Sequence, residues 1–236
     1  EQITDSENQD NGSDSSTAKT VNTELENPAE VFLSNAQKGI TSWFVWLFGI
    51  LFIIVVWLGI GMIPYYSACE YLRCDGDSIA GDWILLEYLL SNYAFIIGII
   101  GVWITVRLFH KKTLTQVITG RRTFDYNRVV YAIWVGLLLH AALLVFDVLF
   151  IHSEMTFRSP NIWEYITFFL FAIVLTTYQA GFEEILFRGY LLQGLSLIAK
   201  NRVFLALVSS LLFVLPHLGN PEPYEYGFTP YVIGMT

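Results

Sequence analysis

Two adjacent glutamates and an arginine lie in the otherwise apolar stretch GFEEILFRGY, residues 181–190. On a helix, Glu184 and Arg188 are four residues apart and face each other, so the arginine can neutralise this glutamate. Glu183 points about 100° away and is left without a cation of its own. Carboxylates in poorly solvated places hold a proton more readily than those in water, which suits a general base. We therefore expect Glu183 to carry the chemistry and the Glu184–Arg188 pair to support it. The alternative is a purely structural ion pair between helices, for which one acid would suffice.

A second polar group lies in the segment FVLPHLGN, residues 213–220. A lone histidine at the end of an apolar span is more often structural. Here, however, Glu183 precedes Lys200 by 17 residues, and His217 follows Lys200 by 17 residues. Two antiparallel helices joined at that turn would place the carboxylate and the imidazole at one depth, about 25 Å from the turn. Asn220, three residues beyond His217, would reach the same region as a hydrogen-bond donor.

These residues carry a resemblance to a known family. The segment EEILFRG fits the pattern E-E-x-x-x-R, and the segment FVLPH fits F-x-x-x-H. Together they resemble the CPBP family of intramembrane proteases, which includes the CAAX prenyl endopeptidases and the bacterial bacteriocin-processing or immunity proteins, also called the Abi family. The two motifs lie within Ile162–Leu218, and the resemblance implies a family core over residues 162–236.

The resemblance implies hydrolysis of a peptide bond within or near the membrane. Glu183 would activate a water, His217 would hold that water or a metal ion, and Asn220 would help to stabilise the oxyanion. Family members are described both with a zinc centre and with a metal-free glutamate centre, so zinc bound by Glu183 and His217 stays an alternative. These two residues are fewer than the three protein ligands that a catalytic zinc site commonly has.

The family pattern also contains a later histidine that is followed four residues on by Asn or Asp. No histidine follows His217, and the last residues, TPYVIGMT, read as the opening of another helix. We therefore expect the reading frame to continue and to supply that histidine about 40–60 residues beyond His217. The 236 residues by themselves are expected to have no peptidase activity.

The elements that must position these groups are membrane spans. The chain is 54% hydrophobic and 14% charged, with a mean hydropathy of +0.51. Several apolar runs reach the roughly 20 residues that cross a bilayer, and they do not alternate as barrel strands would. The sequence predicts an all-α, polytopic transmembrane helical bundle with spans at about 40–63, 83–109, 129–151, 162–199 and 203–218 and the start of another at 228.

The distribution of charge predicts the topology. Residues 1–38 hold eight acids and two lysines, which is −6 of the net −8, and we expect a disordered, acidic, cytoplasmic tail there, followed by a membrane domain over 39–236. The 110–128 loop has five basic residues, whereas the 64–82 loop has one arginine against four acids. Because basic loops stay in the cytoplasm, the 64–82 and 152–161 loops are predicted outside and the 110–128 loop and 200–202 turn inside.

Two details follow from this topology. The run Ile162–Ala199 must cross once, but its 38 residues would extend about 57 Å as a helix, so it must be broken, tilted or protruding, with Gly181 a plausible break. Cys69 and Cys74 lie in the predicted outer loop, where a disulfide and two free thiols are about equally expected.

Three classes of function remain open. The first is an intramembrane endopeptidase acting on a membrane-associated substrate, such as a prenylated protein or a leader peptide, in a bacterial plasma membrane. The second is a non-catalytic relative that serves as a bacteriocin immunity protein or a sensor-binding scaffold. The third is a small proton-coupled transporter that uses Glu183 and His217 together with His140 and Asp147. The expected partners are the lipid bilayer and a peptide or membrane-protein substrate. Nucleic-acid binding has no support.

Overall fold

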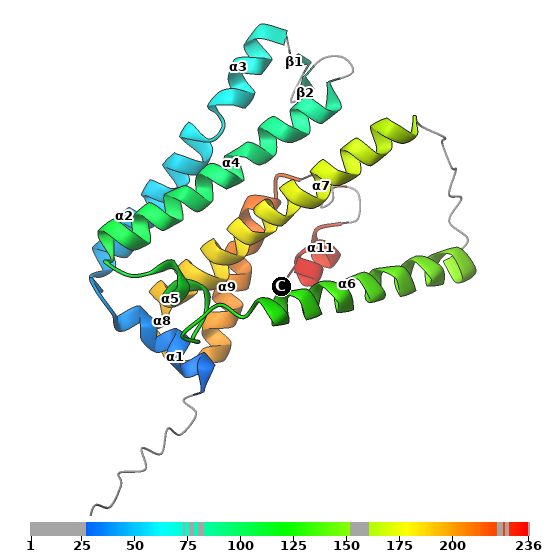
Figure 1. Cartoon of the computed structure of the whole chain (residues 1–236). Helices are drawn as coiled ribbons and strands as arrows, with labels where there is room; N and C mark the ends of the chain where they lie inside the picture. Colours follow the sequence, from blue (N-terminus) through cyan, green and yellow to red (C-terminus); the bar gives the residue numbers. More distant parts are fainter. Residues whose placement is uncertain are drawn as a thin grey trace, which may run out of the picture.

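Long helices dominate the computed structural model of the chain (Figure 1). The structure describes residues 27–72, 74–75, 78–79, 83–151, 161–220, 224 and 227–235. Within these ranges, four helical segments are long and apolar enough to cross a membrane, namely Trp43–Leu72, Leu85–Phe109, Tyr126–Phe150 and Ile162–Ser196. The predicted fold class is thereby confirmed, and the protein is an integral membrane protein. The expected loop at 152–161 falls almost wholly outside the described residues.

Each span consists of an α-helix with a π-helical segment. The first has α2 (Trp43–Ile54), η2 (Val55–Ile60) and α3 (Ile63–Leu72). The second has α4 (Ile84–Ile104) and η3 (Thr105–Phe109), and the third has α6 (Tyr126–Phe146) and η4 (Asp147–Ile151). The fourth has α7 (Ile162–Glu183), η5 (Glu184–Leu191) and α8 (Leu192–Ser196).

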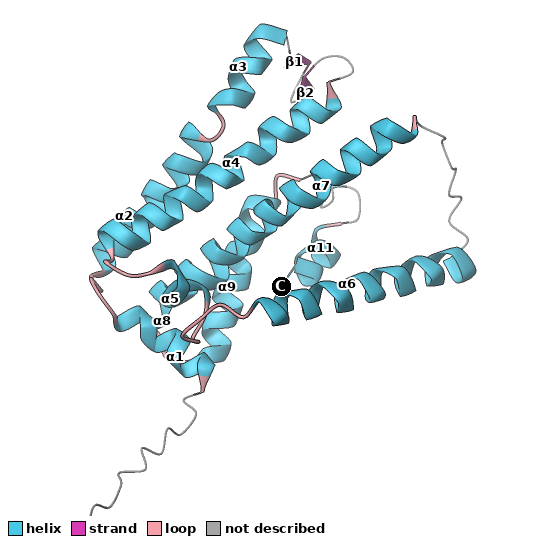
Figure 2. Cartoon of the chain, viewed as in Figure 1, coloured by secondary structure: helices cyan, strands magenta, loops and turns pink. Residues whose placement is uncertain are grey.

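The remaining elements are shorter. They are α1 (Pro28–Ser34), η1 (Asn35–Gln37), α5 (Leu114–Ile118), α9 (Arg202–His217), α11 (Phe228–Met235) and the two-residue strands β1 (Cys74–Asp75) and β2 (Ser78–Ile79). The two strands pair antiparallel, and they are the only strands in the described part of the chain (Figure 2).

The tail predicted to be disordered over residues 1–38 contains a helix near its C-terminal end. Residues 1–26 are outside the described part, but Pro28–Ser34 is helical. Asn27 caps this helix by accepting the N–H of Ala29 at 3.0 Å, and proline is favourable at the first helical position. Gln193 then holds the helix by donating to the Phe32 carbonyl at 3.1 Å. The average composition of residues 1–38 is strongly polar, so it did not indicate this local cap or the apolar residues beside it.

The loop after the first span also begins later than expected. Residues 64–72, assigned to the loop from sequence, continue the first span as α3. The chain then turns through the β1–β2 hairpin, in which Cys74 pairs with Ile79. Cys69 and Cys74 form a disulfide, which decides between the two alternatives left open by the sequence.

A buried polar group joins the ends of the first, second and fourth spans. His110 lies between the carbonyl oxygen of Ile40, 2.9 Å from Nδ1, and the hydroxyl of Tyr190, 2.8 Å from Nε2. Because a carbonyl can only accept, Nδ1 carries the proton and Nε2 accepts from Tyr190. Trp46 packs against both rings, with centroids 4.3 Å and 4.6 Å away. This group fixes the helix that carries the Glu183 motif to the first two spans.

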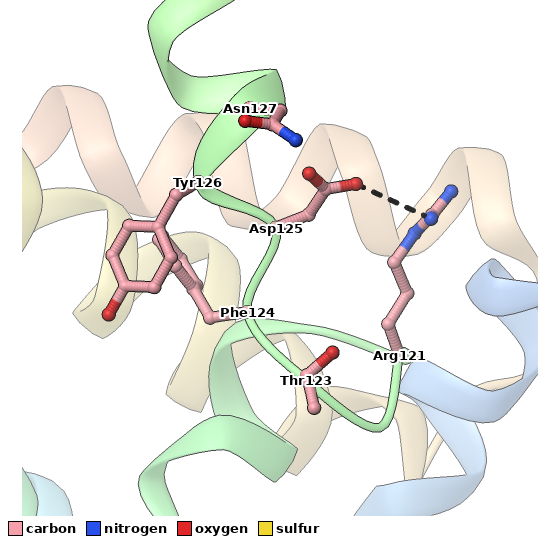
Figure 3. Close-up of a pocket in the computed structure, with 6 residues that line it drawn as sticks. All are labelled: Arg121, Thr123, Phe124, Asp125, Tyr126 and Asn127. Atoms are coloured by element: carbon pink, nitrogen blue, oxygen red, sulfur yellow. Dashed lines mark ion pairs between the residues drawn. The ribbon is translucent and has the colours of Figure 1, made fainter.

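The basic loop between α5 and α6 has its own ion pairs. Asp125 accepts the backbone N–H of Arg128 at 3.3 Å and so caps α6. Its carboxylate also pairs with Arg121 at 3.6 Å, and both side chains line a surface pocket with Thr123, Phe124, Tyr126 and Asn127 (Figure 3). Neither Glu183 nor His217 lines this pocket.

Helix α6 diverges from the other spans (Figure 1). No side chain of α6 is buried, and the Nδ1 of His140 is bonded to the carbonyl of Gly136 in the same helix at 2.8 Å.

A pair of glycine substitutions tests the packing around Tyr190. A Cβ added at Gly49 would lie 2.1 Å from the Tyr190 hydroxyl and 2.7 Å from a methyl of Thr105. We expect Gly49→Ala to lower the melting temperature, with a cost of about 1–3 kcal/mol for overpacking. The matched control is Gly136→Ala on α6, where a Cβ meets nothing within 4 Å. Equal melting temperatures for the two variants in detergent would contradict this packing.

His110 should make stability depend on pH. Burial lowers the pKa of His110 from its usual 6.5. The unfolded chain therefore binds more protons at this residue below pH 6.5, and the free energy of unfolding should decrease as the pH falls below that value. We expect a larger fall in melting temperature between about pH 7.5 and about pH 5.5 for the parent than for His110→Gln. An identical fall in both proteins would show that His110 does not titrate in this way.

Candidate active site

Glu183 and His217 face each other at the ends of two helices. Glu183 is the last residue of α7, and His217 is the last residue of α9, which packs against η5, the continuation of α7. The carboxylate oxygen Oε2 lies 4.0 Å from the imidazole Nε2. The two side chains are 15% and 17% exposed, so both are largely withdrawn from the surface. The predicted close approach, argued from equal spacing to Lys200, is confirmed.

The orientation of His217 is set by its own helix. Nδ1 lies 2.8 Å from the backbone carbonyl oxygen of Phe213, one turn earlier. Since the carbonyl can only accept, the Nδ1–H donates to it. In the neutral ring, Nε2 then carries the lone pair and points toward the carboxylate. With the ring neutral and the carboxylate ionised, Nε2 and Oε2 are two acceptors that face each other across a gap too long for a direct hydrogen bond.

The other oxygen of the Glu183 carboxylate has a separate partner. The side-chain amide Nε2 of Gln179, one turn earlier on α7, donates to Oε1 at 3.2 Å. The two carboxylate oxygens thus have different surroundings, with an amide donor on one side and an imidazole on the other.

Glu184 and Arg188 form the predicted ion pair. Each side chain is 52% exposed, so this pair is more accessible than Glu183. Glu184 and Arg188 line a pocket with residues of α1 and of the turn after α5, whereas neither Glu183 nor His217 lines it. Glu183 and Glu184 therefore lie on different faces of the helix, as predicted.

Phe213 links the two motifs. The guanidinium of Arg188 lies 5.5 Å from the centre of the Phe213 ring, in cation–π contact. Phe213 also contacts His217, whose ring centre is 4.6 Å away. The Phe213 ring therefore contacts both the guanidinium and the imidazole, while the guanidinium pairs with Glu184.

The π-helical segment η5 follows Glu183 directly. Its Phe187 carbonyl accepts a hydrogen bond at 2.9 Å from the buried hydroxyl of Ser209 on α9. Phe187 also contacts Phe213 edge-on, with ring centres 5.4 Å apart. Gly181, the expected break, lies inside α7, and the irregularity falls instead at Glu184–Leu191. The irregularity thus lies where Ser209 of α9 donates to a carbonyl of the long span, and not at Gly181.

Two donors converge on the carbonyl of His217. The hydroxyl of Tyr231 on α11 donates to it at 3.0 Å, and the backbone N–H of Asn220 donates at 3.1 Å. Asn220 thus lies in the turn just after α9, next to His217. Its expected role at an oxyanion stays a prediction.

The side-chain donors at this site do not match those of a catalytic metal site. Among the described residues, no group of three or more His, Cys, Asp or Glu side chains could hold a metal ion. Glu183 and His217 are two donors, one fewer than the usual protein ligands of a catalytic zinc. We therefore derive no step through a metal.

Sequence reasoning did not single out two contact residues of the site. Gln179 precedes Glu183 by four residues, so the helical period alone could have indicated it. Tyr231 contacts His217 across 14 residues and an intervening turn, and no local pattern marks such a contact.

Comparisons with known proteins agree with the two motifs. Residues 161–236 match the family described as type II CAAX prenyl endopeptidase Rce1-like. The chain is also 28% identical over 186 residues to the uncharacterised protein YyaK of Bacillus subtilis (strain 168), covering 75% of this chain and 62% of that protein. No solved structure matches. The predicted resemblance is confirmed for the segment that contains Glu183 and His217: residues 161–236 have the sequence pattern of the Rce1-like CAAX prenyl endopeptidases, members of the CPBP family.

Proposed function

We propose that the protein is an intramembrane endopeptidase in which Glu183 activates a water for attack on a peptide bond. The observation that carries this proposal is the pair of facing acceptors, Glu183 Oε2 and His217 Nε2, 4.0 Å apart. A water between them would donate one hydrogen to each, and bridging waters are common across polar gaps of this length.

The reaction would use this water as the nucleophile. Its oxygen forms a bond to the carbonyl carbon of the scissile peptide, while Glu183 takes its proton as a general base. The tetrahedral intermediate collapses with cleavage of the C–N bond, and Glu183 returns the proton to the leaving nitrogen. His217 holds and orients the water throughout, and Asn220 is a candidate donor to the oxyanion.

The substrate would be a membrane-associated peptide. The site lies within a chain of four apolar spans, so a substrate must reach it from the bilayer or along its surface. A prenylated C-terminal segment is the first candidate, since residues 161–236 match a family described as CAAX prenyl endopeptidases. A leader peptide is the second. The chain covers 62% of the relative's length, so these assignments are proposals for the whole protein.

Two other functions compete with this one. A non-catalytic immunity or scaffold protein would bind a peptide or sensor without cleaving it. A proton-coupled transporter would use Glu183, His217, His140 and Asp147 as a relay, but His140 lies on α6, the helix that diverges from the rest (Figure 1). Neither competitor requires cleavage that depends on Glu183.

Glu183→Gln and Glu184→Gln form a matched pair that tests the mechanism. We expect Glu183→Gln to keep its melting temperature and lose roughly 100- to 10,000-fold in cleavage rate, because the general base is removed. Glu184→Gln should mainly lower the melting temperature, and only slightly, because its ion pair is half-exposed.

The assay uses the protein expressed from its full reading frame, reconstituted in liposomes with an internally quenched farnesylated peptide. New N-termini in membranes of cells that produce the parent or Glu183→Gln are measured in parallel, to include unprenylated substrates. If neither assay shows cleavage that depends on Glu183, the peptidase proposal is wrong and a binding function is favoured.

The proposed topology places the Cys69–Cys74 hairpin outside the cell and the 110–128 loop in the cytoplasm. After treatment of intact cells with an impermeant reductant, we expect an impermeant maleimide to label Cys69 and Cys74. The control is Arg121→Cys in a background in which both native cysteines are serine, and it should be labelled only after permeabilisation. The reverse pattern would invert the topology.

A further inference from the structure

Gln179 holds one end of the Glu183 carboxylate. Its amide Nε2 donates to Oε1 at 3.2 Å from one helical turn earlier, and the contact is partly buried. The other oxygen, Oε2, faces the His217 imidazole at 4.0 Å. The amide and the imidazole thus lie on different oxygens of the same group.

This arrangement limits the orientations of the carboxylate. A glutamate side chain has three rotatable bonds, and its carboxylate can present either oxygen to a partner. A donor to Oε1 stabilises the conformer in which Oε2 is directed at His217. Without it, the carboxylate can rotate toward other donors, and displacement of a reacting group by about 1 Å is enough to cost rate.

Gln179 is suited to orient the Glu183 carboxylate because the neighbouring arginine has other partners. Arg188 is paired with Glu184 and lies over Phe213, so it does not take this place. An amide is uncharged, so it can orient a carboxylate without the Coulombic attraction that an arginine would add. Such attraction would hold the carboxylate in its ionised form and oppose its role as a proton acceptor.

We propose that Gln179 is a positioning residue, which holds Glu183 Oε1 so that Oε2 stays directed at His217 and at the water between them. This inference rests on the proposed peptidase function and adds a residue outside the two sequence motifs. It assigns to Gln179 an effect on turnover rather than on substrate binding.

The test is the near-isosteric substitution Gln179→Met, which keeps the length of the side chain and removes the donor. We expect kcat to fall by roughly 10- to 100-fold, the range for loss of a hydrogen bond to a charged group, with KM and melting temperature unchanged. The control is Thr177→Val on the same helix. Among the described contacts, the Thr177 hydroxyl donates only to the Ile173 carbonyl of its own helix, at 2.7 Å. Thr177→Val should retain the parental kcat.

A double variant separates positioning from general damage. If Gln179 acts through Glu183, then Gln179→Met should cause no further loss in a Glu183→Gln background. A further 10-fold loss in that background, or an unchanged kcat in Gln179→Met alone, would overturn the proposal.

A second measurement does not depend on activity. The carboxylate infrared band of Glu183, obtained as the difference between parent and Glu183→Gln, should shift in Gln179→Met and stay in place in Thr177→Val. Equal cleavage by parent and Glu183→Gln would refute the proposed function, and the infrared shift would then still decide whether Gln179 holds the carboxylate. Cleavage that depends on Glu183, with no infrared shift in Gln179→Met, would refute the role of Gln179 alone.

Discussion

The structure depends on the high cost of leaving a polar group without a partner inside a membrane protein. Three polar groups near the site meet this constraint in different ways. Glu184 pairs with Arg188, Ser209 satisfies a carbonyl of the π-helical segment, and the Nδ1–H of His217 donates to the Phe213 carbonyl. Oε2 of Glu183 and the Nε2 lone pair of neutral His217 face each other, and both need a hydrogen-bond donor. This shared need for a donor is the basis of the proposed chemistry.

The same constraint explains how the two motifs form one site. Arg188 contacts the face of Phe213, and Phe213 contacts His217, so the arginine motif and the histidine motif are joined by an aromatic ring. At the cytoplasmic end of the proposed topology, His110 and Tyr190 fix the fourth span to the first two. The position of Glu183 is thus set from both sides: by α9 through Phe187 and Phe213, and by the first spans through Tyr190.

The sequence predicted the four long spans, the Glu184–Arg188 pair and the close approach of Glu183 and His217, because these follow from hydropathy and helical period. It also predicted a span at 203–218, where α9 is a shorter apolar helix. It did not predict α1, whose cap at Asn27 is local and lies in a strongly polar region. It placed the irregularity of the long span at Gly181, whereas the π-helical segment begins at Glu184, where α9 supplies a partner. The contact of Tyr231 with His217 is set by tertiary packing and left no local signal.

The central claim is that Glu183 and His217 act as one unit on a single water. The most direct test measures turnover by Glu183→Gln, His217→Gln and the double variant of the full-length protein in liposomes. Groups that act together are strongly non-additive, so the account predicts that the double variant is about as slow as either single variant. Losses that multiply in the double variant would show that the two side chains act independently, and would contradict the account.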